Sequence, residues 1–136
     1  MTRLVCALVA TAVLTGISVR PASAIKQFQD EWMKIYVDDS SNKEFVEAAK
    51  EAKCFICHQG KKKSNHNPYG IHLVPLLTKK DKKDVEKITK AIKDVGAKHS
   101  DAKDKSSPTY DKIIAGGKLP GGTLEEAKKE PSKAAK

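Results

Sequence analysis

The sequence predicts an all-α protein, and two observations support this. Apolar side chains recur at helical spacing along most of the chain, whereas no segment alternates apolar and polar residues as a half-buried strand does. Proline, glycine and asparagine then divide the chain into short segments, each of helical length. The total length of 136 residues predicts a single small domain.

The first 24 residues have the three-part layout of a secretory signal peptide. Arg3 precedes an apolar run over residues 4–19, Arg20 and Pro21 end that run, and residues 22–24 (Ala-Ser-Ala) form a small-residue cleavage site. The run is shorter than the roughly 20 residues that a membrane span needs. We therefore expect cleavage after Ala24, a secreted or periplasmic protein, and no stable membrane insertion afterwards.

The helices can be placed from their apolar stripes and their capping residues. Ser41 and Glu44 fit a capping box, and Asn67 before Pro68 fits a helix start. The first two expected helices cover residues 26–37 and 42–53. A short third helix carries Tyr69, Leu73, Leu76 and Leu77, and a fourth carries Val85, Ile88, Ile92 and Val95 and is closed by Gly96. The last expected helix runs from Ser107-Pro108 to Gly116. Residues 25–120 form the expected domain, and residues 121–136 the expected flexible lysine-rich tail.

Charge limits the class of partner. The formal net charge is +9, and the only two arginines, Arg3 and Arg20, lie in the leader. Lysine lacks the planar guanidinium group with which arginine forms paired hydrogen bonds to bases and phosphates. Aromatic residues also make up only 5% of the chain, so we expect no nucleic-acid partner. A lysine surface on an exported protein instead predicts docking to an acidic partner protein.

The chemistry of the chain is concentrated in one segment. Cys6 lies in the leader, and the only other cysteines stand in Cys54-Phe55-Ile56-Cys57-His58, the CxxCH pattern of covalent haem attachment. Positions i, i+3 and i+4 share one face of a helical turn, so both sulfurs can reach one porphyrin edge while the imidazole lies under the ring. A haem would also enlarge an otherwise thin apolar core.

Three other interpretations of the pair are open. A thioredoxin-like redox site needs a βαβ context that the sequence lacks. A zinc site needs four ligands, and Cys54, Cys57 and His58 would have to recruit His66, His72 or His99 as the fourth. A disulfide would close only a four-residue loop and add little stability.

The chain resembles small bacterial monohaem c-type cytochromes. The resemblance rests on CFICH, on the helix that leads into it and on the turn Asn67-Pro68-Tyr69-Gly70, and it covers roughly residues 26–118. It implies a small cytochrome c-like helical domain wrapped around one covalent haem c, held by Cys54 and Cys57 with His58 as an axial iron ligand. It also implies an electron carrier rather than an enzyme.

The chain departs from that family at the second axial ligand. Such cytochromes place a methionine downstream of CxxCH, but no methionine follows His58 here. Met33 and His72 are the leading distal candidates, with His66 and His99 behind them, and a lysine or an open position completes the set. An open or weakly held position would favour the alternative function, a gas-binding or catalytic haem protein.

Overall fold

Helices form almost all the regular structure of the protein. The computed structural model describes residues 25–132, and the proposed signal peptide at 1–24 lies outside the described residues. The helices run in the order α1 (Lys26–Tyr36), α2 (Lys43–Ala52), η1 (Lys53–Ile56), η2 (Gly70–His72), η3 (Lys79–Lys83), α3 (Val85–Gly96), α4 (Tyr110–Ala115) and α5 (Leu124–Lys128). The expected all-α class is confirmed. Among the described residues, the only β-pairing is two isolated bridges, His58 with His66 and His99 with Thr109.

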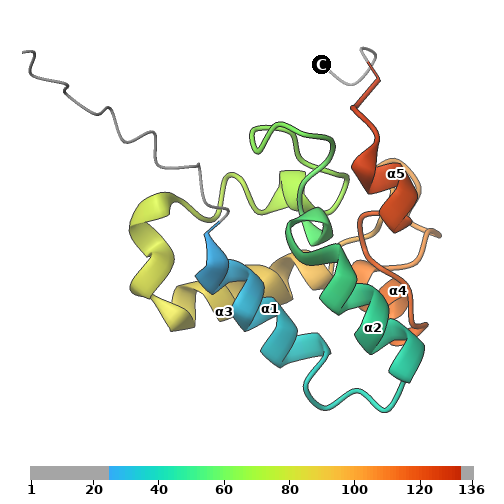
Figure 1. Cartoon of the computed structure of the whole chain (residues 1–136), viewed down its shortest axis with the longest axis horizontal. Coiled ribbons are helices and arrows are strands. Elements are labelled where there is room, and N and C mark those ends of the chain that lie inside the picture. Colours follow the sequence, from blue (N-terminus) through green and yellow to red (C-terminus); the bar gives the residue numbers. More distant parts are fainter. Residues whose placement is uncertain (1–24, 133–136) are drawn as a thin grey trace, which may run out of the picture.

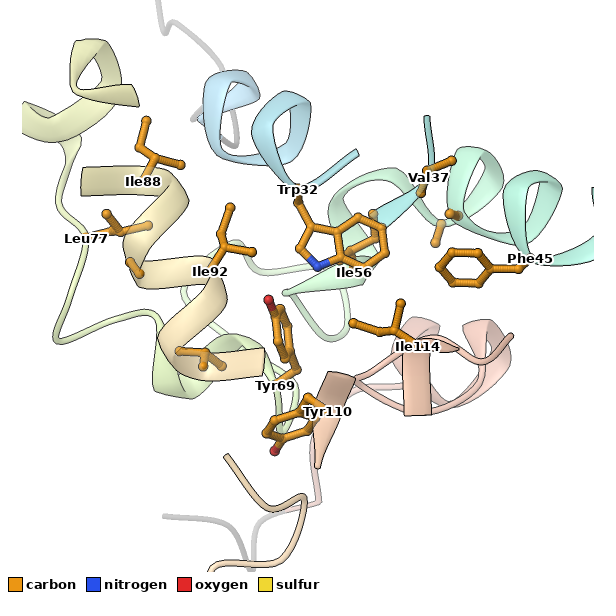
Figure 2. Close-up of a cluster of buried hydrophobic side chains, with 14 residues drawn as sticks. Trp32, Val37, Phe45, Ile56, Tyr69, Leu77, Ile88, Ile92, Tyr110 and Ile114 are labelled. Atoms are coloured by element: carbon orange, nitrogen blue, oxygen red, sulfur yellow. The ribbon is translucent and has the colours of Figure 1, made fainter. Parts of the chain in front are cut away.

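The core lies where α1, α3 and α4 meet the segment that carries the two cysteines. α1 packs across α3, and α2 leads into η1 on the other side of the core (Figure 1). Figure 2 shows the central side chains, with Trp32 from α1 facing Ile92 of α3 and Tyr69 stacked edge-on against Tyr110. The largest buried groups are Trp32, Tyr69 and Tyr110, all at most 1% exposed. Three aromatic rings therefore provide much of the apolar area that a chain this small can bury.

The helix starts follow the polar residues that precede them, with two differences from expectation. α2 begins at Lys43 with Asn42 as its N-cap, in place of the expected Ser41–Glu44 capping box, because the Asn42 side chain accepts from the Phe45 N–H. The Tyr69–Leu77 stretch forms only the single turn η2, and the carbonyls after it are used in short-range turns. Thr78 caps η3, and α3 starts separately with Asp84 as its cap.

Glycine at position 96 has a different role from the expected helix stop. Gly96 is the last residue of α3, and a Cβ there would collide with Asp111 and with the hydroxyl of Tyr36. That hydroxyl donates to Asp111 Oδ1 at 2.7 Å, which joins α1 to α4 across the end of α3. Burial and the Asp111 contact raise the pKa of Tyr36 far above its ordinary value. Gly96 is therefore required by close packing between three helices.

The segment expected to be a flexible tail contains regular structure. Residues 124–128 form α5, which starts with a complete capping box between Thr123 and Glu126. Ala127 of this helix is 3% exposed, and α5 packs on η1 beside the loop after α2 (Figure 1). The expected domain boundary at residue 120 thus divides segments that are in contact.

Candidate functional site

The CFICH segment follows a sharp change of backbone direction. Lys53, the residue between α2 and Cys54, has φ 48° and ψ −116°, the only positive φ among non-glycine residues described. The conformation costs a residue with a Cβ on the order of 1 kcal/mol, so packing on both sides must impose it. Cys54 and Ile56 then lie within the tight turn η1, and the His58 N–H donates to the Cys54 carbonyl at 2.9 Å. The turn expected to group the two sulfurs and the imidazole is therefore present.

Both cysteines are free thiols, and both are partly exposed. Burial among apolar neighbours, with Cys54 close by, raises the pKa of Cys57 to about 12. Redox-active and metal-binding cysteines need the opposite shift, because the thiolate is the reactive and ligating form. The raised pKa of Cys57 therefore gives no sign of an activated thiolate at this position.

His58 is oriented through one of its two ring nitrogens. Its Nδ1 lies 3.2 Å from the Asn65 carbonyl oxygen, and a carbonyl only accepts, so Nδ1 carries the proton. Burial and the nearby His66 lower the pKa of His58, which favours the neutral ring. Histidines that bind metals use this pattern, with one N–H on a backbone carbonyl and the other nitrogen on the metal. Nε2 is thus the nitrogen left free to bind a metal.

Asn67 holds the turn from the inside, a role that the sequence analysis missed. Its side chain is 1% exposed and donates to the carbonyls of Phe55 and Ile56, both at 2.9 Å. Its Oδ1 accepts from the N–H groups of Tyr69 and Gly70. Sequence reasoning treated Asn67 only as a helix cap, and the Asn-Pro-Tyr-Gly spacing was the available signal for more.

Two glycines allow the surrounding backbone to come close. A Cβ on Gly70 would overlap the Cys57 carbonyl, and a Cβ on Gly121 would overlap the Asn67 carboxamide. Gly121 belongs to the segment expected to be a tail. The site therefore combines three stretches of chain: residues 53–58, residues 65–70 and residues 121–130.

The other histidines and Met33 take different positions. His66 lies beside His58, with ring centroids 4.8 Å apart across their β-bridge. Direct contact places it on the same side as His58, which disfavours it as the ligand opposite His58. His99 has Nδ1 on the Ser107 carbonyl at 2.6 Å, in the bridge to Thr109. Met33 packs partly buried against the core, and His72 is half-buried with its ring 5.9 Å from Tyr110.

Two buried polar atoms in the core have no hydrogen-bond partner among residues 25–132. They are Trp32 Nε1 and the Tyr69 hydroxyl oxygen, which Figure 2 shows facing each other. The indole is close enough to influence the pKa of Tyr69, which burial and the nearby Cys57 raise strongly. An indole N–H can only donate, and unpaired buried donors are rare in folded proteins. The Tyr69 hydroxyl oxygen, which faces the indole, is the nearest acceptor that the core offers to this N–H.

The residues present fit a covalent haem better than a bare metal ion. Within residues 25–132, no three side chains among His, Cys, Asp and Glu gather into a metal-binding group, so the structure offers no zinc tetrahedron. A haem needs only two thiols for attachment and one oriented imidazole from this segment.

Comparisons of this chain with protein-family models, with curated proteins and with solved structures find no match. Along residues 25–132, none of the helices is long and apolar enough to cross a membrane.

Proposed function

We propose that the protein is a monohaem c-type cytochrome that transfers single electrons. Cys54 and Cys57 would attach the haem, and His58 would be its proximal iron ligand. The observation that carries this proposal is the His58 Nδ1 contact with the Asn65 carbonyl, at the end of the turn that holds both thiols. This contact fixes the tautomer and the ring orientation that a metal-bound imidazole requires.

The state of the thiols supports covalent attachment. Thioether formation adds each thiol S–H across one vinyl group, with sulfur on one carbon and hydrogen on the other, so it needs reduced cysteines and no oxidant. Cys54 and Cys57 are both reduced and not paired with each other. Bound haem supplies an iron that cycles between Fe(II) and Fe(III). The protein's own contribution is twofold. Asn67 holds the turn that carries the two cysteines, and the Asn65 carbonyl holds the His58 imidazole.

The charge of the chain supports a carrier that docks to an acidic protein. Lys61, Lys62 and Lys63 are exposed in the loop that follows the CFICH segment. Positive charge around a redox site raises the rate of encounter with a negative partner, and added salt weakens this effect. We propose a secreted or periplasmic location because the N-terminal segment has the signal-peptide layout.

The experiment that tests the proposal is production of the full chain in a host that matures c-type cytochromes. We expect a coloured protein whose haem stays on the polypeptide after denaturation. Cys54→Ala and Cys57→Ala should lose most of this covalent haem. His58→Ala should lose the low-spin spectrum, whereas the control Lys50→Ala, at an exposed position on α2 that carries none of the named histidine or methionine candidates, should keep it. Colourless wild-type protein with two free thiols would overturn the proposal.

A further inference from the structure

The C-terminal clamp, defined as residues 123–130, is attached to the chain just after His58. The Gly60 N–H donates to the Ala127 carbonyl of α5 at 2.8 Å. Gly60 is buried and has φ 67°, and a Cβ there would come within 3.1 Å of the Glu130 Cα. Only glycine combines that backbone conformation with so close an approach. The clamp therefore has a defined position relative to the site.

Glu130 connects the clamp to both ends of the loop at residues 61–65. Its Oε1 accepts from the Lys61 N–H at 2.9 Å, and its Oε2 accepts from the Asn65 side-chain amide at 3.4 Å. One carboxylate thus spans a loop of five residues that includes three consecutive lysines. Hydrogen bonds to an ionised carboxylate are stronger than neutral ones, so this contact restricts the loop.

The far end of this chain of contacts is the imidazole. The Asn65 carbonyl accepts from the Gln59 N–H at 3.1 Å and lies 3.2 Å from His58 Nδ1. Glu130 contacts the side chain of Asn65, and the backbone of Asn65 contacts the ring of His58. A second, longer contact also links the clamp to this carbonyl, because Gln59 Nε2 donates to the Glu126 carbonyl at 3.5 Å while the Gln59 N–H donates to the Asn65 carbonyl. Glu130 is the residue of the clamp that contacts Asn65 itself.

We propose that Glu130 is a positioning residue for His58, acting through Asn65. The inference rests on the proposed function, since its effect is read at the iron. Groups behind a ligating histidine fix its orientation and raise its basicity as a ligand. A firmly held Asn65 carbonyl makes His58 a stronger donor and favours Fe(III). Loosening the loop should therefore favour Fe(II) and raise the reduction potential.

The test compares four variants of the haem-loaded protein by redox titration. Glu130→Ala removes both the charge and the acceptor, whereas Glu130→Gln removes the charge but keeps an oxygen for the Lys61 N–H. Glu125→Ala removes an exposed α5 carboxylate that makes no hydrogen bond within residues 25–132, and it controls for charge alone. Asn65→Ala keeps the backbone carbonyl and removes the amide that reaches Glu130, which provides a second route to the same effect.

At a fixed applied potential, we expect Glu130→Ala to lower the Fe(III)/Fe(II) ratio by about threefold to tenfold. A tenfold change corresponds to a rise of about 59 mV in the reduction potential. Asn65→Ala should shift in the same direction, and Glu130→Gln and Glu125→Ala should shift less. Hydrogen exchange of the Lys61 amide should be at least about tenfold faster in Glu130→Ala than in Glu130→Gln.

Two outcomes separate this inference from the proposed function. If the wild type carried covalent haem but Glu130→Ala shifted no more than Glu125→Ala, the positioning role would be wrong and the cytochrome would stand. If the wild type carried no covalent haem, both would be wrong. An equal shift in Glu130→Ala and Glu130→Gln, with equal amide exchange, would assign the effect to charge and also overturn the positioning role.

Discussion

The main-chain N–H of Asn67 donates to the carbonyl of Cys57 at 3.1 Å, so the second half of the site is fastened to the last cysteine by backbone as well as by side chain. The buried Asn67 carboxamide makes four further contacts, with Phe55, Ile56, Tyr69 and Gly70. A loop so connected has few ways to rearrange without exposing unpaired backbone groups. The geometry of the two thiols therefore depends on a residue ten positions downstream of Cys57.

Asn67→Ala should destabilise the protein by about 3 kcal/mol and reduce the yield of covalent haem. The substitution leaves two buried carbonyls and two N–H groups without their partner, and each such loss costs about 1–3 kcal/mol when no water replaces it. Denaturant unfolding measures the stability, and haem per polypeptide measures attachment. Asn42→Ala is the matched control, because Asn42 makes one capping bond at α2, and it should cost only about 1 kcal/mol without loss of haem.

Lys53→Gly should stabilise the protein by about 1 kcal/mol, although glycine usually weakens a helix. Lys53 has a positive φ that glycine adopts without a steric penalty. Lys50→Gly lies inside α2, and it should instead destabilise by about 1 kcal/mol. If denaturant unfolding shows that the two substitutions change the free energy of unfolding in opposite directions, the result supports a strained backbone at the junction before Cys54. Destabilisation by both substitutions would mean that the backbone at position 53 is ordinary.

Asp81 should make stability depend on acid pH. Contacts with Lys87 and Thr78 lower the pKa of Asp81 to about 2 from its ordinary 3.8. Its ionised form is therefore favoured in the folded state, and the stabilisation is present above about pH 4 and lost as pH falls from about 4 towards 2. The stability difference between wild type and Asp81→Asn should be largest near neutral pH and should vanish at the acid end. Asp39→Asn, which removes an exposed carboxylate after α1, is the control for the loss of one negative charge.

The distal position can be assigned by carbon monoxide binding to the reduced protein. Met33 and His72 both remain predicted ligands, since each lies partly buried. If one of them binds the iron firmly, the wild type should bind carbon monoxide slowly, and replacing that residue with leucine should speed binding by about tenfold or more while the other substitution changes little. Prompt binding by the wild type would contradict both assignments and favour the gas-binding or catalytic alternative.

The sequence by itself determined the helical class and the positions of the longer helices, and it singled out Cys54, Cys57 and His58 as the residues proposed to hold a haem. α1 and α3 could be located because their apolar stripes have a helical period over three turns, and Thr78 was recognisable as a cap. The CFICH pattern could be recognised from the sequence because its proposed chemistry depends only on residue spacing within one turn. Such local properties need no knowledge of what lies across the fold.

Only the tertiary structure decided which distant residues build the site. The sequence predicts a helix cap at Asn67, a tail over residues 121–136 and a helix stop at Gly96. In the structure, Asn67 also fastens the cysteine turn, α5 packs on η1, and Gly96 makes room for Tyr36 and Asp111. Single charged or small residues carry no periodic signal, so their partners become visible only when the chain has folded back on itself. The contact from Glu130 through Asn65 to His58 crosses more than 60 positions of sequence, and only packing brings those groups together.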